Sequence, residues 1–171
     1  VTHADQFQLA GETFRNTGEH IGQDGIQVGG GFNTVIHHNT IKHWAEKHQG
    51  FDVHGIQVGS GTTQARVYNN ILDDGGYAFT DQGGGGVWAS GAGAMVSHCE
   101  IVRNRGTRDG YAAGAYVGGG AKLRNCLVGW NTEAGWNGAG VRLDSAGSLV
   151  ESCTIVSNAL SDRSLGSDAL T

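Results

Sequence analysis

The chain repeats itself with a period of about thirty residues, and this repeat constrains the fold more than any other feature of the sequence. Five short runs superpose: "VIHHNTI" (35–41), "VYNNIL" (67–72), "VSHCEI" (96–101), "LRNCLV" (123–128) and "VESCTI" (150–155). They share one column, Asn39, Asn70, Cys99, Cys126 and Cys153, whose steps are 31, 29, 27 and 27 residues. A period of about 20 to 50 residues is typical of a solenoid in which each repeat forms one coil.

A second set of runs precedes the first and alternates apolar with polar residues, as a half-buried strand does. These runs are "GIQVG" (25–29), "GIQVG" (55–59), "GVWAS" (86–90), "GAYVG" (114–118) and "GVRLD" (140–144). Gly-rich stretches such as "GGGFN" and "GGGAK" join the two runs of a repeat. We therefore predict that equivalent strands of successive coils stack into parallel sheets.

The coil length and the aliphatic columns resemble the right-handed parallel β-helix of the pectate-lyase-like superfamily, over roughly residues 20–158. The pattern "V-x-N-C-x-I-x-x-N" after "GGGV" is also similar to the repeats of bacterial polymorphic outer-membrane proteins. This resemblance implies an all-β fold: a single right-handed parallel β-helix of about six coils, with 27–31 residues per coil and three faces. We expect the β-helix to span 1–158, with an irregular first coil at 1–20, and 159–171 to form a tail or cap. The fold hosts lyases, hydrolases, epimerases and adhesins, so it does not specify an activity.

The turn columns predict how the coils are held together. We expect the Asn side chains to be buried and to satisfy one another and the backbone along the stack. Cys replaces Asn in the later coils because a small thiol packs there too, so the three cysteines are predicted to be buried and reduced. His38 shares a neighbouring turn column with Asn69, His98, Asn125 and Ser152, which favours a structural role for it.

Composition and charge exclude several classes of partner. The formal net charge is −5 and no basic stripe is present, which argues against nucleic acid. No apolar run of about 18 residues is present to span a membrane. The chain begins without Met or a signal sequence, and we expect a mature or excised segment of an extracellular or cell-surface protein.

One outward row of the predicted strands carries side chains suited to sugars. The middle residues of the second set of runs are Gln27, Gln57, Trp88, Tyr116 and Arg142, and we expect Gln8 to begin this row. Amides bond hydroxyl groups and aromatic rings stack on pyranose faces, so the row predicts a polysaccharide track. The alternative is an exposed sheet surface made of ordinary strand-forming residues.

The sharpest catalytic candidate is "DVH" (52–54), since Asp52 and His54 would share a strand face and a carboxylate fixes an imidazole tautomer for acid–base chemistry. The tripeptide is similar to the D-P-H motif of alginate C5-epimerases. Asp5, Asp24 and His54 also fall where polygalacturonases carry N-T-D, D-D and G-H-G, although Gly25 replaces the second Asp and "VWAS" (87–90) replaces R-I-K. The resemblance implies Asp5, Asp24, Asp52 and His54 as catalytic residues. The alternative is that Asp and His before Gly are turn residues.

Three acidic residues are candidates for a metal site. Asp73 and Asp74 lie in "ILDDGG" (71–76) and Asp81 follows in "TDQGG" (80–84). Adjacent carboxylates at a Gly turn could hold Ca²⁺, as a pectate-lyase type of reaction requires. The alternative is a pair of solvated turn acids.

Two main functions therefore remain open, beside a third, phage-spike-like interpretation that requires a trimer. The first is an extracellular carbohydrate-active protein that binds a polysaccharide, with lyase, glycoside hydrolase and epimerase chemistry as its candidate reactions. The second is a non-catalytic structural or adhesive solenoid, part of a surface protein or filament, that self-associates through its ends because exposed solenoid ends must be capped or paired.

Overall fold

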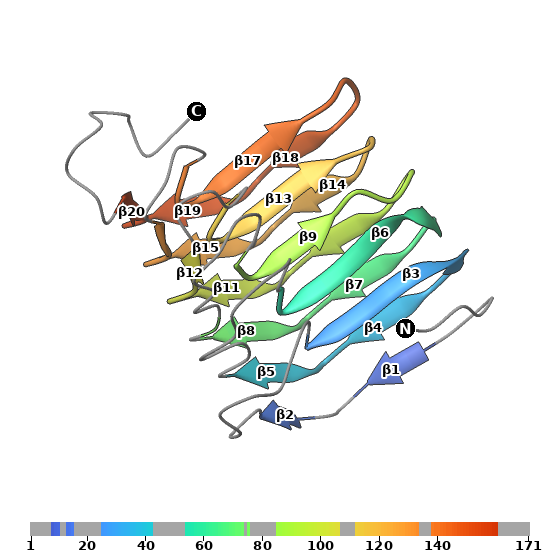
Figure 1. Ribbon diagram of the computed structural model, residues 1–171, viewed down its shortest axis with the longest axis horizontal. Coiled ribbons are helices and arrows are strands. Elements are labelled where there is room, and N and C mark those ends of the chain that lie inside the picture. The colour runs from blue at the N-terminus through green and yellow to red at the C-terminus, as the bar shows by residue number, and fades with distance from the viewer. Residues whose placement is uncertain are drawn as a thin grey trace.

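The computed structural model describes residues 8–10, 13–15, 25–42, 54–73, 75, 85–106, 112–133 and 138–160. Every helix or strand element in these ranges is a β-strand, and equivalent strands of successive coils lie side by side (Figure 1). Across the same ranges, nothing helical has the length and apolar character that crossing a membrane requires. The prediction of an all-β solenoid is confirmed.

Three large parallel sheets run along the solenoid. Sheet A consists of β3 (Ile26–Phe32), β6 (Ile56–Thr63), β9 (Val87–Ala89), β13 (Ala115–Gly118) and β17 (Val141–Asp144). Sheet B consists of β1 (Gln8–Ala10), β4 (Val35–His37), β7 (Arg66–Tyr68), β10 (Met95–Ser97), β14 (Lys122–Arg124) and β18 (Leu149–Glu151). Sheet C consists of β2 (Thr13–Arg15), β5 (Thr40–Lys42), β8 (Ile71–Asp73), β11 (Glu100–Val102), β15 (Leu127–Gly129) and β19 (Thr154–Val156).

The chain passes through sheets A, B and C in turn and then returns to sheet A one strand further along. A small fourth sheet, D, contains β12 (Arg105–Gly106), β16 (Thr132–Glu133) and β20 (Ala159–Leu160). The six strands of sheets B and C define six coils. The first coil joins them through β1 and β2, and Gln8 pairs with Val35 in sheet B. The expectation that Gln8 begins the row on sheet A is therefore wrong.

Aliphatic side chains from the three sheets fill the interior. In β4, β7, β10 and β14 of sheet B the middle residue points inward, and these residues, Ile36, Val67, Val96 and Leu123, are almost completely buried. The equivalent inward residues of sheet C are also completely buried: Ile41, Leu72, Ile101 and Val128. Each such side chain contributes about 1.5–3 kcal/mol relative to an exposed one. The columns aligned from the sequence are thus the hydrophobic core.

Polar ladders hold the corners between the sheets. In the B–C ladder (Asn39, Asn70, Cys99, Cys126, Cys153), the Asn39 backbone N–H donates to Asn70 Oδ1 at 3.0 Å. The N–H groups of Cys99 and Cys126 approach the Sγ atoms of Cys126 and Cys153 at 3.4 and 3.5 Å. All three cysteines are free, with Cys99 and Cys126 buried and Cys153 half-buried. The prediction of buried cysteines is confirmed for Cys99 and Cys126, whereas Cys153, in the last coil, is only half-buried.

The C–D ladder (Asn104, Asn131, Asn158) repeats this arrangement at the next corner. The N–H groups of Asn104 and Asn131 donate to the Oδ1 atoms of Asn131 and Asn158 at 2.9 and 3.0 Å. Asn131 Nδ2 also donates to the Ile101 carbonyl at 3.0 Å. These bonds satisfy buried backbone groups that would otherwise destabilise the coil.

A left-handed residue precedes each ladder position and turns the chain through the corner. The B–C corner column is His38, Asn69, His98, Asn125 and Ser152, whose φ angles lie between 51° and 57°. Asn69 Nδ2 lies 3.3 Å from His38 Nε2, and Asn125 Nδ2 lies 3.5 Å from His98 Nε2. The predicted shared turn column is confirmed.

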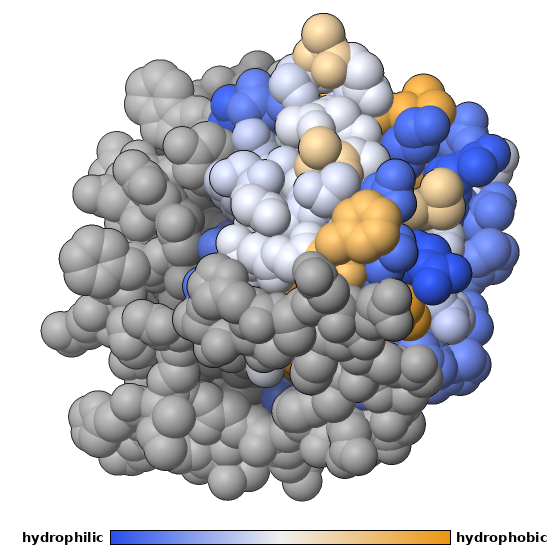
Figure 2. Space-filling model, turned by 90° about the vertical axis from the view of Figure 1, so that its right-hand side faces the viewer, coloured by the Kyte–Doolittle hydropathy of each residue, from blue (hydrophilic) through white to orange (hydrophobic). Residues whose placement is uncertain are grey.

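The corner between sheets A and B is formed by small residues. Figure 2 shows it as a pale band of intermediate hydropathy beside a strongly hydrophilic surface. Gly119 there has a φ of 59°, and a Cβ atom on it would lie 2.1 Å from the Ser90 carbonyl oxygen. Only glycine fits such a close approach between neighbouring coils.

Candidate functional site

The outward row predicted on sheet A exists in perfect register. Gln27 pairs with Gln57, Gln57 with Trp88, Trp88 with Tyr116 and Tyr116 with Arg142. We call these five residues the sheet A row. Gln27, Gln57, Trp88 and Arg142 are half-buried, whereas Tyr116 is only 7% exposed. The row therefore crosses five consecutive coils on the outside of one sheet.

The side chains of the sheet A row contact one another along the solenoid axis. Gln27 Nε2 donates a hydrogen bond to Gln57 Oε1. The rings of Trp88 and Tyr116 stack with centroids 3.8 Å apart and planes 11° apart. The Tyr116 hydroxyl donates to Asp144 Oδ2 at 2.5 Å. Because the two aromatic faces meet each other, the row presents ring edges and amides outward instead of the flat face that stacking on a sugar requires.

His54 lies inside the coil immediately before β6. Its side chain is 0% exposed, and its ring centroid is 5.3 Å from that of Trp88. Its carbonyl accepts a hydrogen bond from the Gly25 N–H at 2.9 Å. In this arrangement the imidazole supports the wall of sheet A and does not reach the outer surface. The other catalytic candidates, Asp5, Asp24 and Asp52, lie outside the described residues.

Asp73 is the one calcium candidate that the structure describes, and two cations surround it. Arg103 Nε donates to Asp73 Oδ1 at 2.8 Å, and Lys42 Nζ lies 3.4 Å from Asp73 Oδ2. Burial alone would raise the pKa of Asp73, but the hydrogen bond and charge of Arg103, followed by those of Lys42, outweigh it and hold that pKa below its ordinary value. The two cations oppose a bound Ca²⁺. Asp74 and Asp81 lie outside the described residues.

No metal-binding group was found in the described part of the chain. There, no three or more His, Cys, Asp or Glu side chains gather closely enough to hold an ion. The described acids and histidines are instead distributed over separate faces and corners.

An exposed tryptophan at the corner between sheets C and D was not predicted. Trp130 is 48% exposed and has a φ of 55°, and it shares its column with Arg103 and Ser157, whose φ angles are 55° and 54°. We call these three residues the C–D corner column. A sequence signal for it exists, since each of its members immediately precedes a residue of the C–D ladder in "RN", "WN" and "SN". The bulky Trp in this left-handed position is unusual.

Comparisons with known proteins agree with this architecture. The family model described as a right-handed β-helix region matches residues 24–167. Comparison with curated proteins and with solved structures found no match. The matched range contains all strands of sheets A and D and all strands of sheets B and C after the first coil. The chain therefore belongs to the right-handed β-helix family.

Proposed function

We propose that this chain is an extracellular or cell-surface solenoid that binds a polysaccharide along its outer surface, parallel to the axis of the β-helix. The observation that carries this proposal is the sheet A row, in which amide, indole, phenol and guanidinium groups follow one another over five coils. Neighbouring members are about 4.8 Å apart, the spacing of strands in a sheet. The Trp88 indole N–H and the Tyr116 hydroxyl already donate to Ser90 and Asp144. The amides of Gln27 and Gln57 and the guanidinium of Arg142 are therefore the polar groups of the row that suit a regular polymer of hydroxyl-bearing rings.

Half-buried amides are well placed to take part in this binding. The bond from Gln27 to Gln57 fixes both side chains, which lowers the entropy lost when a ligand binds. It uses one Nε2 hydrogen of Gln27 and one Oε1 lone pair of Gln57, and each amide has further donor and acceptor capacity. Arg142 adds a guanidinium at the other end of the row, which suits a hydroxyl or a carboxylate.

Binding is the core of the proposal, and cleavage or epimerisation is an additional activity that would depend on Asp5, Asp24 and Asp52. Buried His54 can act on a substrate only if the wall of sheet A opens. A reducing-end assay would detect hydrolysis, and ultraviolet absorbance of an unsaturated product would detect elimination. The assay would compare wild type with His54→Ala, with and without Ca²⁺.

The binding test is affinity electrophoresis in gels that contain polygalacturonate, alginate, xylan or mixed-linkage β-glucan. We expect the wild type to be retarded by at least one glycan, and Gln57→Ala and Arg142→Ala to be retarded less. Ile71→Ala, an exposed change on sheet C, serves as the matched control and should migrate like wild type. Equal mobility of the wild type in all four gels and in an empty gel would refute the proposal.

A second candidate is a structural or adhesive solenoid whose ends associate. The observation that favours it is the last coil, where the inward Leu143 is 50% exposed while its neighbour in the same column, Val117, is 1% exposed. Val150, Cys153 and Ile155 are likewise only partly buried. An end that exposes core positions can pair with the end of another solenoid.

A further inference from the structure

We propose that Trp130 is the aromatic platform for the polysaccharide, with a pyranose ring stacked on its exposed indole at the corner between sheets C and D. This inference rests on the proposed function and adds a second contact surface for the polysaccharide, separate from the sheet A row, together with the residue that stacks on a sugar ring. It differs from the sequence-based expectation, which assigned stacking to Trp88 and Tyr116. Those two rings already stack on each other, at 3.8 Å between centroids.

The backbone gives the first reason to look for a function at this position. Trp130 has a φ of 55°, in the left-handed region that glycine and asparagine tolerate and bulky side chains avoid. The equivalent corner between sheets B and C uses His, Asn and Ser. Because nearly half of the Trp130 side chain is exposed, core packing does not account for a tryptophan there. A strained residue whose side chain faces solvent points to a binding role.

The neighbours in the C–D corner column leave the indole accessible. Arg103 binds Asp73, which belongs to the coil before that of Arg103, so its guanidinium is drawn away from Trp130. On the other side, Ser157 is exposed and too short to cover an indole. Trp130 therefore differs from Trp88, whose ring face is covered by the next residue of its own row.

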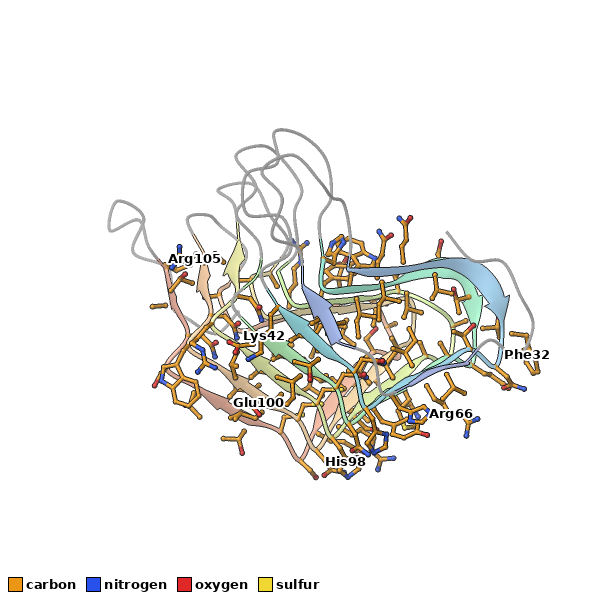
Figure 3. All side chains as sticks on the ribbon, turned by 90° about the horizontal axis from the view of Figure 1, so that it is seen from below. Phe32, Lys42, Arg66, His98, Glu100 and Arg105 are labelled. Atoms are coloured by element: carbon orange, nitrogen blue, oxygen red, sulfur yellow. The ribbon has the colours of Figure 1, made fainter. Side chains whose placement is uncertain are left out.

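The surroundings of Trp130 supply groups that bond a sugar. Arg105 in β12 and Thr132 in β16 are paired on neighbouring parallel strands, and Thr132 is only two residues beyond Trp130. Figure 3 shows Arg105 and Glu100 on the same side of the solenoid, opposite Phe32. Guanidinium and hydroxyl groups on the strands that follow this corner suit the hydroxyls or carboxylates at the edge of a stacked pyranose. A polymer lying along this corner would run parallel to the solenoid axis.

The decisive variant is Trp130→Asn, because asparagine tolerates the left-handed conformation and removes the ring. We expect its urea midpoint to equal or exceed that of wild type, and its affinity in gels of the same four glycans to fall about tenfold, as loss of one aromatic contact implies. Trp130→Phe should retain part of the affinity. Ile71→Ala, at an exposed position of sheet C outside both proposed contact surfaces, serves as the control and should bind like wild type.

Three results would overturn the inference. If Trp130→Asn binds like wild type while Gln57→Ala binds less, polysaccharide binding stands and Trp130 is not its platform. If Trp130→Asn lowers the urea midpoint, the tryptophan is a structural residue. If no gel retards the wild type, the proposed function fails and this inference fails with it.

Discussion

Single residues in the ladders determine how tightly the coils are joined. A ladder residue accepts a backbone N–H of the coil before it, and an Asn there also donates to a carbonyl of that coil, so one side chain satisfies two buried backbone groups. Asn131 does this for Asn104 at 2.9 Å and also bonds the Ile101 carbonyl at 3.0 Å. Cysteine performs the first task at the B–C corner with longer contacts to sulfur, of 3.4 and 3.5 Å.

Asn131→Ala should therefore lower the free energy of unfolding by about 3 kcal/mol, because it orphans buried polar groups that each cost about 1–3 kcal/mol. Asn131→Cys should lose less, since a thiol can still accept the Asn104 N–H. Urea denaturation of both variants measures the difference. Equal losses for Ala and Cys would contradict the role assigned to sulfur in the ladders. Asn125→Ser, at an exposed corner position that Ser152 fills in the next coil, is the control.

The same ladder predicts the order in which the cysteines react. The pKa of the Cys126 thiol is raised by the hydrogen bond between Cys126 and Cys99 and then by burial. Burial also raises the pKa of Cys153. Since the thiolate is the nucleophile, we expect Cys126 and Cys153 to resist iodoacetamide in the native state. The hydrogen bond with Cys126 lowers the pKa of Cys99, but Cys99 is only 2% exposed, so burial protects it and half-buried Cys153 should react first. Peptide mass spectrometry after timed alkylation reads out the order. Labelling of Cys99 ahead of Cys153 would contradict the packing at this corner.

The repeat in the sequence predicted the ladders, the columns and the cysteines because stacked coils bring residues one period apart into contact. It could not predict which way a side chain turns within its row. Burial of His54 and the stacking of Trp88 on Tyr116 depend on rotamers and on neighbouring coils, and so does the exposure of Trp130. Gln8 was misplaced because the second set of runs has no member in the first coil to align with it.

At the scale of strands, an ion cluster links β5, β8 and the corner after β11. Asp73 in β8 contacts Lys42 in β5 and Arg103 just after β11, which ties three successive coils together on sheet C. Lys42 and Arg103 are substantially exposed, so solvent screens the pairs and their contribution is about 1 kcal/mol.

Because of this ion cluster, the stability of the fold should decrease at low pH. The folded pKa of Asp73 lies below its unfolded value of about 3.9, so the contribution is fully present above that pH and is lost as pH falls through the folded pKa. The free energy of unfolding of the wild type should exceed that of Asp73→Asn by about 1 kcal/mol at neutral pH. This difference should vanish in strong acid. Urea midpoints at several pH values test this, and a difference independent of pH would refute it.

The corner between sheets A and B offers a matched pair of glycines. A Cβ on Gly119 would meet the Ser90 carbonyl at 2.1 Å, whereas a Cβ on Gly120 has nothing within 4 Å. Both have positive φ angles, of 59° and 82°. Gly120→Ala should therefore cost about 1 kcal/mol for its backbone conformation alone, and Gly119→Ala about 2–4 kcal/mol. Thermal denaturation of the two variants compares the costs, and equal costs would show that the coils can separate at this corner.

At the scale of the whole molecule, the six coils form one continuous core that remains partly open at its last coil. Leu143 occupies an inward position there, yet half of its side chain is exposed. If the ends associate, wild type should show a concentration-dependent rise in mass by light scattering, and Leu143→Lys should abolish it. Ile71→Lys on the lateral face of sheet C is the control and should assemble like wild type. Association that survives Leu143→Lys would exclude this end as the interface.

The repeat also explains why the sequence predicts the whole fold better than the function. All coils of the solenoid share the same approximate length and the same core columns, so these features follow from the period of the sequence alone. Binding depends on the outer side chains, which vary from coil to coil. The sheet A row was predicted in full because its members lie at one strand position, whereas Trp130 lies at a corner where the neighbouring coils carry Arg and Ser.

Polysaccharide binding is the central claim, and the mobility of the wild-type protein in the four glycan gels tests it most directly. The account predicts retardation by at least one glycan, with soluble glycan restoring the mobility seen in an empty gel. Equal mobility in every gel, together with mass that rises with concentration, would contradict the account and favour an assembling structural solenoid.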